Sequence, residues 1–337
     1  MRVFRDMISI APMVDVTDKH FRYMCRLLTK KSLLYTEMIT APAIIKGNRN
    51  NLLSYNSVEN PLVLQIAGSD PKEMSEAVKL VEKWDFDELN LNVGCPSAKV
   101  SEYEMGLSLM RKPDLVAEIA TAMRSSTKKK ISIKHRLGVV DNMNQINMEK
   151  ICADLRNFIS TVSKAGVSKF IIHARIGVLN LDTKKNRSVP EIDYNEVYKI
   201  KKEFSDLEIE INGGIKSIED IKLHLSKVDG VMLGRVAYEN PLFLAKLDSF
   251  SETKDFDESK FDPSIIRKKL VMGMVDYIKE QEACGNESYN ILKHLHSIYS
   301  GEPGSRKWKQ LVGAPWDKTR KASQILEEAY NLIENKK

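Results

Sequence analysis

The sequence lacks any apolar run that approaches the roughly 20 residues of a membrane-spanning helix. Its 337 residues include only 16 Gly and 11 Pro, and 42% of them are hydrophobic, which excludes collagen-like and disordered low-complexity chains. An apolar β-rich run starts by Ile8 and leaves no room for a secretory or transit peptide before it. We therefore expect a globular protein of the cytoplasm with no membrane partner.

Cysteine is scarce as well. The four cysteines, Cys25, Cys95, Cys152 and Cys284, lie far apart and form neither a C-x-x-C pair nor a zinc-binding spacing. We expect reduced thiols and no bound metal. No G-x-G-x-x-G motif follows the first strand pattern, which argues against a dinucleotide held in a Rossmann fold.

What the sequence does contain is an alternation of short apolar runs with amphipathic helical patterns such as 71–83, 113–124 and 151–165. Alternating β and α patterns predict parallel strands joined by crossovers. Eight such runs predict a closed (β/α)8 barrel, a TIM barrel. The runs are 8–13, 33–38, 61–68, 88–95, 131–136, 169–175, 208–213 and 230–235.

The chain exceeds a typical barrel by enough residues for an added module. We predict a catalytic barrel over residues 1–247, a linker over 248–262 that is rich in Ser, Asp, Glu and Lys, and a C-terminal helical domain over 263–337. Four helical patterns fill that domain, at 264–282, 289–300, 305–312 and 317–335.

The mild basic excess gathers at the carboxyl end. Net charge is +6, and residues 259–337 carry 14 Lys or Arg against 10 Asp or Glu. On charge alone, a solvated helical surface is the favoured interpretation, and a polyanionic partner is the alternative.

Polar residues stand where the apolar runs stop. Cys95, Lys134, His173, Asn212 and the pair Gly234-Arg235 each lie at the carboxyl end of a different run. A (β/α)8 barrel builds its active site from the carboxyl ends of its strands, so we expect these residues to meet at the mouth of the barrel. A cysteine in that position is a candidate acid or nucleophile.

Glycine follows the seventh and eighth runs, in Asn212-Gly213-Gly214 and Gly234-Arg235. The loops after these two strands commonly hold a phosphate with backbone N–H groups, although glycine also serves simply to turn the chain. Gln65, Lys134 and His173 form a donor set suited to a polar heterocycle such as isoalloxazine, and a positive Lys134 would stabilise an anionic reduced flavin. FMN therefore fits this pattern better than NAD as the bound cofactor.

These residues belong to motifs that stand in the order of a known family: Ala11-Pro12-Met13, Leu34-Tyr35-Thr36-Glu37-Met38, Leu64-Gln65, Leu89-Asn90-Leu91-Asn92-Val93-Gly94-Cys95-Pro96-Ser97, His173-Ala174-Arg175, Ile211-Asn212-Gly213-Gly214-Ile215 and Gly234-Arg235. Over nearly its whole length the chain resembles the tRNA-dihydrouridine synthases, flavin enzymes that reduce uridine to 5,6-dihydrouridine in the D-loop of tRNA. Residues 184–187, Pro190, Asp193-Tyr194 and the run 301–308 are most similar to the A-type bacterial subgroup.

The resemblance implies roles for single residues. It makes Cys95 the general acid, with hydride passing from reduced FMN N5 to C6 of uridine and NADPH restoring the flavin. It implies an FMN-binding barrel and a tRNA-binding helical domain, with tRNA as the partner, no protein partner and a monomer. The implied FMN contacts are Pro12, Met13, Gln65, Lys134, His173, Asn212, Gly213, Gly214, Gly234 and Arg235, and the implied tRNA contacts are Asn92, Arg175, Lys184, Asn186, Arg187 and Arg306. The chain departs from its relatives in the loop 98–106, at His135 and at 107–110.

Uracil chemistry explains why a thiol suits this reaction. Hydride addition at C6 leaves enolate character at C5, and that carbon then needs a proton. A thiol with a pKa near 8.5 is mostly protonated at neutral pH yet gives up its proton readily. The alternative for Cys95 is a buried inert cysteine, which is the interpretation we keep for Cys25, Cys152 and Cys284, and His173 could be no more than a satisfied histidine at a strand end.

The helical tail has a possible purpose in substrate access. A uridine inside folded tRNA must be extracted from its stack, and the enzyme must grip the backbone with cations such as Arg306, Lys307 and Lys309. Trp308 is more simply a core anchor of the tail helices. Two other functions stay open: an FMN barrel that reduces a free pyrimidine-like small molecule, and a barrel that binds tRNA without chemistry.

Overall fold

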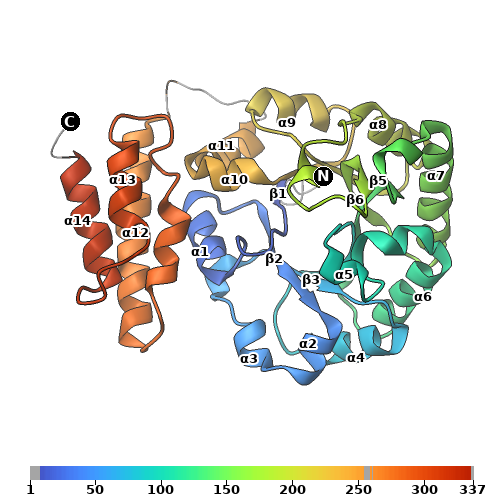
Figure 1. The fold of residues 1–337 in the computed structure, drawn as a ribbon, viewed down its shortest axis with the longest axis horizontal. Coiled ribbons are helices and arrows are strands. Elements are labelled where there is room, and N and C mark those ends of the chain that lie inside the picture. The colour runs from blue at the N-terminus through green and yellow to red at the C-terminus, as the bar shows by residue number, and fades with distance from the viewer. Residues whose placement is uncertain (1–7, 254–258, 260, 335–337) are drawn as a thin grey trace. The chain divides into compact units, whose positions relative to one another are not determined.

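The computed structural model describes residues 8–253, 259 and 261–334 (Figure 1). Its described residues fall into two compact units. The first contains residues 8–14 and 33–234, and the second contains residues 15–32 and the chain from Arg235 onward. No helix in the described part of the chain is both long and apolar enough to cross a membrane.

The first unit is an eight-stranded barrel in which every strand pairs in parallel with its neighbours in chain order, and β1 pairs with β8 to close the ring. The predicted (β/α)8 barrel is therefore confirmed. The strands are β1 (Ile8–Ile10), β2 (Leu33–Thr40), β3 (Leu62–Ala67), β4 (Glu88–Val93), β5 (Lys130–Val140), β6 (Lys169–Val178), β7 (Glu208–Asn212) and β8 (Gly230–Leu233).

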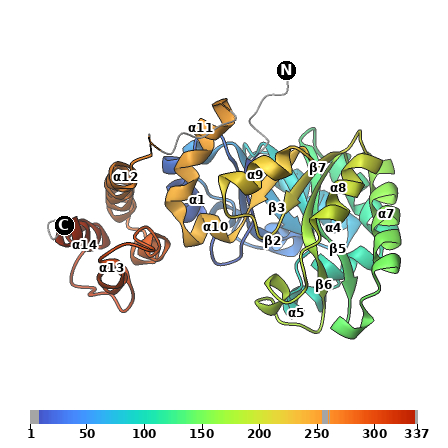
Figure 2. The same ribbon diagram turned by 90° about the horizontal axis from the view of Figure 1, so that it is seen from above.

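Helices cover the outside of this barrel, as Figure 1 shows for α4, α6 and α7 and Figure 2 shows for α7. Because they screen the outer face while side chains fill the inner one, β3 and β4 are buried at all their positions. The helical elements of this unit are α2 (Ala41–Lys46), α3 (Arg49–Leu52), η2 (Ser57–Glu59), α4 (Pro71–Val81), α5 (Ala98–Ser101), η3 (Gly106–Arg111), α6 (Pro113–Arg124), η4 (Met143–Gln145), α7 (Met148–Lys164), η5 (Lys185–Arg187), α8 (Tyr194–Glu203) and α9 (Ile218–Leu225).

Strands β5 and β6 run further than the sequence predicts. Their pairing continues through Val140 and Val178 after an irregularity between Arg136 and Gly138. The predicted strands stopped at Arg136 and Arg175 because polar residues interrupt the apolar pattern there. Residues 179–184 connect the longer β6 to the short helix η5, which holds the predicted basic turn.

The second unit is helical, and its α14 packs against both α12 and α13 (Figure 2). Predicted helices 264–282 and 305–312 are present, whereas the pattern at 289–300 forms a 3-10 helix over Tyr289–Leu295. Of the predicted linker 248–262, the first six residues continue α11, and residues 254–258 and 260 lie outside the described part. The elements are α1 (Lys19–Leu28), α10 (Arg235–Glu239), η6 (Pro241–Leu244), α11 (Ala245–Thr253), α12 (Pro263–Ala283), η8 (Tyr289–Leu295), α13 (Ser305–Val312) and α14 (Ala322–Glu334).

Trp308 anchors α13 to this unit. Its side chain is fully buried, its indole Nε1 donates to the Leu295 carbonyl at 2.8 Å, and its ring lies 4.8 Å from that of Tyr299. The interpretation of Trp308 as a core anchor is therefore confirmed. Burying this one aromatic leaves its neighbours Arg306, Lys307 and Lys309 exposed on the helix surface.

His135 is an unusual residue for the buried layer between strand β5 and the covering helix α7. Its ring packs against Phe158 and Phe170, with Nδ1 at 2.7 Å from the Arg136 carbonyl, and Nε2 has no partner among the described residues. Burial, reinforced by the charge of Lys134, lowers the pKa of His135 to about 4. The histidine is therefore neutral in the folded protein at physiological pH.

This burial predicts acid-dependent stability. Below about pH 6.5, the ordinary pKa of histidine, the unfolded chain binds a proton at this residue that the folded protein does not bind. The free energy of unfolding therefore falls between about pH 6.5 and pH 4, by roughly 3 kcal/mol at most. Replacing this residue in His135→Met should remove that loss. Urea unfolding of both proteins across this pH range measures their free energies of unfolding. The difference between the two proteins near about pH 7.5 serves as the baseline. Identical pH dependence of the two proteins would show that His135 titrates normally.

Candidate active site

Cys95 lies two residues beyond β4, at the carboxyl end of the barrel strands. The side chain of Asn92 holds this turn, because its Oδ1 accepts hydrogen bonds from the backbone N–H of Cys95 at 3.0 Å and of Gly94 at 3.2 Å. The thiol is partly buried, and burial raises its pKa above the ordinary value. Cys95 is therefore a protonated thiol at neutral pH, as a general acid requires.

The loop after Cys95 returns to the same residue. The Leu107 N–H donates to the Cys95 carbonyl at 2.9 Å, which closes the loop 96–106 at its base. Gly106 adopts a φ of +67°, and a Cβ on it would lie 2.7 Å from the Cys95 carbonyl oxygen, so glycine is required where the loop comes back. Glu104 pairs with Lys112 at 2.7 Å. Hydrogen bonds and this ion pair thus hold the loop at its base and beside η3.

Gln65 on β3 is joined directly to this turn. Its Oε1 accepts from Asn92 Nδ2 at 2.8 Å, and its Nε2 donates to Asn90 Oδ1 at 2.8 Å. The fully buried Asn90 continues the chain of bonds to Ser132 Oγ at 2.8 Å. Sequence reasoning missed Asn90 and Ser132, because the alternation of β4 and β5 marks them only as interior positions.

Lys134 and Asn212 form a second part of the site. Lys134 Nζ donates to Asn212 Oδ1 at 3.1 Å, and Asn212 is oriented by donating to the Met232 carbonyl at 2.8 Å. Burial, and then the charge of Arg136, lower the pKa of Lys134 to about 8. Asn212 pairs in register with His173 on β6, so all three predicted cofactor residues are neighbours.

The two glycine loops differ in form. Gly213 and Gly214 adopt φ values of +118° and +73°, and a Cβ on Gly213 would lie 2.7 Å from the His173 ring, so only glycine fits there. A Cβ on Gly234 would meet no atom within 4 Å, which shows open space beside the end of β8. Arg235 follows directly, is exposed, and begins α10.

Pro12 and Met13 follow β1 at the same end of the barrel. The Ala11 N–H donates to the Leu233 carbonyl at 2.8 Å, which extends the β1–β8 pairing up to these residues. Met13 packs, partly buried, against the core cluster that contains Tyr35 and Ile171.

The predicted tRNA contacts divide into exposed and buried residues. Lys184 and Arg187 are exposed on the turn around η5, and Arg306 is exposed on α13. Asn186 is fully buried, and its amide bonds the backbone of Val178 at both ends and that of Leu181 at 2.7 Å. Asn186 therefore shapes the basic turn rather than offering a free amide to RNA.

Two buried arginines support this turn. Arg136, which sequence reasoning also missed, donates to the Gly94 carbonyl at 3.1 Å and to the Asn186 carbonyl at 3.1 Å, so it links the cysteine turn to η5. Arg175 is only 8% exposed and donates to the Pro190 carbonyl. Asn92 is similarly buried, at 7% exposed. Burial leaves both residues little surface for contact with a large ligand such as tRNA.

These residues fit a flavin mononucleotide. The paired Lys134 and Asn212, the amide of Gln65 and the ring of His173 supply donors to a polar heterocycle, and the two glycine loops leave backbone N–H groups approachable by a phosphate. Gly234 borders open space, and the absence of a side chain there leaves that space clear for a ligand. The donor set and the glycine positions thus agree with one ligand that has a planar polar head and a phosphate.

The fold and site define a (β/α)8 barrel whose mouth combines a protonated thiol with a donor set for a planar cofactor. Residues 9–334 match the family described as Dihydrouridine synthase (Dus), and the chain belongs to this family. Three curated relatives, each called tRNA-dihydrouridine(20/20a) synthase, are similar along their length. They are those of Synechocystis sp. (41% identical, 90% of this chain and 88% of the relative), Vibrio cholerae (40%, 97% and 96%) and Escherichia coli O6:H1 (41%, 98% and 96%).

The raised pKa of Cys95 predicts slow alkylation by iodoacetamide. Only the thiolate is the nucleophile, so at about pH 8 Cys95 should react more slowly than the exposed Cys284, and its rate should keep rising as the pH is raised further. Mass spectrometry of tryptic peptides after timed labelling follows both residues in one sample. Faster labelling of Cys95 than of Cys284 would identify a thiolate and exclude the general-acid role.

Proposed function

We propose that this protein reduces uridine to 5,6-dihydrouridine in the D-loop of tRNA, at the positions 20 and 20a that its relatives' names specify. The observation that carries the proposal is the placement of Cys95. It is a protonated thiol at the end of β4, held by Asn92, at the barrel end where Lys134 and Asn212 meet. Membership of the dihydrouridine synthase family supports the same reaction.

FMN is the proposed cofactor. Its ring would contact Gln65, Lys134 and His173, and its phosphate would bind the loop Asn212–Gly214 together with the Gly234-Arg235 step. Pro12 and Met13 would border it. When bound, FMN in its reduced form supplies the hydride that adds to C6 of uridine, with NADPH as the source of electrons.

Cys95 completes the reduction. As C6 receives hydride, the electron pair of the C5=C6 bond moves to C5, and the thiol gives its proton to that carbon. The resulting thiolate is stabilised by the charges of Arg136 and Lys134, both of which act to lower the pKa of Cys95. Solvent then returns the proton to sulfur. Asn92 holds the backbone of Cys95, and so its thiol, in place during the step.

Cations of both units are proposed to bind the tRNA backbone. In the barrel unit, Lys184 and Arg187 are exposed on a turn that Asn186 holds rigid. In the helical unit, an open groove of about 770 Å³ is lined by Arg306 and Lys309 together with Ser305, Gln310 and Ala314. Phosphate groups fit such basic, polar surfaces. We expect the enzyme to act as a monomer in the cytoplasm.

Mapping of dihydrouridine by mass spectrometry tests the function directly. In tRNA from cells that lack this protein, uridine should replace dihydrouridine at positions 20 and 20a, and restoring the gene should restore the modification. The purified protein should also be yellow and release FMN on denaturation, as a barrel that binds tRNA without chemistry would not. Unchanged tRNA combined with reduction of a free pyrimidine would favour the small-molecule alternative.

Cys95→Ala isolates the acid step. The variant should bind FMN and accept electrons from NADPH like the wild type, yet lose dihydrouridine formation by about a hundredfold or more, since acid catalysis is typically worth that much. Cys152→Ala, on the exterior helix α7, is the matched control and should keep full activity. Turnover of tRNA by Cys95→Ala at the wild-type rate would remove Cys95 from the mechanism.

Charge reversal at Arg187 and Arg306 tests the tRNA grip. Each lost phosphate contact should flatten the slope of log K against log salt by roughly one unit, because fewer counterions are released. The variants Arg187→Glu and Arg306→Glu should therefore bind tRNA more weakly while their FMN content and NADPH oxidation stay normal. Lys128→Glu, on the exposed turn before β5, is the control. Wild-type affinity of the double variant at several salt concentrations would place the grip elsewhere.

A further inference from the structure

A continuous run of buried side chains crosses the interior of the barrel from the cysteine turn to its opposite end. Gln65, Asn90 and Ser132 are register partners on the successive strands β3, β4 and β5, and each is at most 1% exposed. Hydrogen bonds of 2.8 Å join Asn92 to Gln65, Gln65 to Asn90, and Asn90 to Ser132. The hydroxyl of Ser132 then donates to Glu88 Oε1.

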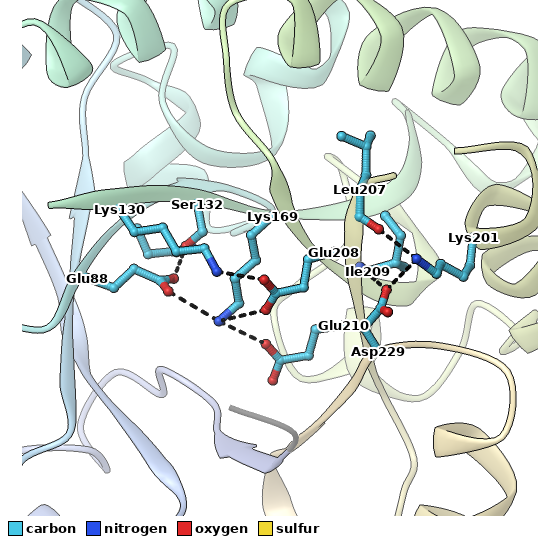
Figure 3. Close-up of polar contacts among 11 residues, drawn as sticks. Glu88, Lys130, Ser132, Lys169, Lys201, Leu207, Glu208, Ile209, Glu210 and Asp229 are labelled. Atoms are coloured by element: carbon cyan, nitrogen blue, oxygen red, sulfur yellow. Dashed lines mark hydrogen bonds and ion pairs between the residues drawn. The ribbon is translucent and has the colours of Figure 1, made fainter. Parts of the chain in front are cut away.

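Glu88 belongs to a buried ionic cluster around Lys169, which Figure 3 shows with its ammonium group directed at three carboxylates. Lys169 Nζ lies 3.2 Å from Glu88, 3.7 Å from Glu208 and 3.6 Å from Glu210. Burial lowers the pKa of Lys169, but the surrounding charges outweigh this and raise it well above its usual value. Lys169 is therefore charged, and because an ammonium group can only donate, Glu88 Oε2 accepts a hydrogen bond from it at this end of the run.

The two ends of the run fix its direction. At the cysteine turn, the backbone N–H groups of Gly94 and Cys95 can only donate, so Asn92 must present its oxygen to them and its nitrogen to Gln65. Gln65 must then present its oxygen to Asn92 and its nitrogen to Asn90.

The bonds at the Glu88 end fix the same direction. The Ser132 hydroxyl donates to Glu88 Oε1, and its oxygen accepts from Asn90 Nδ2. Asn90 therefore presents its oxygen to Gln65, which agrees with the assignment reached from the cysteine turn. One arrangement satisfies every hydrogen bond of the run. Reversing a single amide would set donor against donor on one side and acceptor against acceptor on the other, and would leave buried polar groups without partners.

We propose that Asn90 and Ser132 are positioning residues. Their hydrogen bonds connect Glu88 to the amides of Gln65 and Asn92 and help to hold those amides in one orientation. This inference rests on the proposed function, since Gln65 is a proposed FMN contact and Asn92 holds Cys95. The run ties these two amides, which the cysteine turn already orients, to a carboxyl group at the other end of the barrel, so both ends hold each amide in the same orientation. Neither Asn90 nor Ser132 touches the reacting atoms.

Ser132→Ala breaks the run at its link to Glu88, and Ser9→Ala is a closely matched control. Ser9 is equally buried, and its hydroxyl donates to Glu210 in the same ionic cluster, but it has no part in the run of amides. Ser132→Thr keeps the hydroxyl. We expect Ser132→Ala to weaken FMN binding to the apoprotein, to shift the visible absorption of bound FMN, and to lower kcat by roughly tenfold with the KM for tRNA unchanged.

The matched variants decide between positioning and simple stability. The inference is supported if Ser9→Ala keeps the wild-type FMN absorption and kcat and if Ser132→Thr recovers both. Loss of a buried hydroxyl alone would change the protein equally at Ser9 and at Ser132. Equal behaviour of Ser132→Ala and Ser9→Ala would overturn it. If Ser132→Ala does not fold, Ser132→Cys and Ser9→Cys, which keep the volume and weaken the bonds, are compared in the same way.

A second readout separates this inference from the proposed function. A wild-type protein that takes up no FMN would refute the proposed cofactor. The side-chain amide NMR signals of Gln65 and Asn92 in the apoprotein still test the polarity: they should shift in Ser132→Ala and stay in place in Ser9→Ala. Unmoved signals in both variants would overturn the inference whatever the cofactor.

Discussion

The pairing of β1 with β8 is the interaction on which the rest of the barrel unit depends. Ile8, Ser9 and Ile10 pair in register with Val231, Met232 and Leu233, and the Ala11 N–H adds one more bond to the Leu233 carbonyl. A closed sheet has no free edge, and its parallel strands all end at one rim. Residues as distant in sequence as Cys95 and Asn212 are brought to that rim by closure alone.

The interior of this barrel is more polar than its apolar strand pattern suggests. Barrel interiors are usually filled by branched aliphatic side chains, yet here Lys169 and three glutamates occupy the end opposite the cysteine turn (Figure 3). Lys130 also pairs with Glu208, at 2.6 Å, so two lysines face three carboxyl groups. Burial raises the pKa of Glu210, which favours its protonated form. Such a cluster contributes little stability compared with apolar packing. Hydrogen bonds through Ser132 connect this cluster to Asn90 and Gln65, and so to the proposed cofactor site.

The sequence predicted the fold well where a local pattern decides the structure. All eight strands lie where apolar runs predicted them, because a parallel strand covered on both faces is apolar along most of its length. Cys95 and Asn212 could be recognised since each ends such a run. The helix over 263–283 was predictable for the same reason, with Asp262 as its N-cap and Pro263 in its first turn.

Other features depend on partners far away in the sequence. The burial of Asn186 follows from the path of the loop after β6, and nothing in Lys184-Lys185-Asn186-Arg187 distinguishes the buried asparagine from its exposed neighbours. The length of β5 beyond Arg136 depends on its pairing with β6. The bond from Asn90 to Ser132 joins residues 42 positions apart, and only the barrel register brings them together.

Incubation of the purified protein with an unmodified tRNA transcript, FMN and NADPH tests the central claim most directly. Digestion and mass spectrometry should find a uridine of the D-loop that has gained two hydrogen atoms, in a yield that grows with time and requires NADPH. A protein that carries FMN and oxidises NADPH, yet leaves every uridine of the transcript unchanged while reducing a free pyrimidine, would contradict the assignment of tRNA as its substrate.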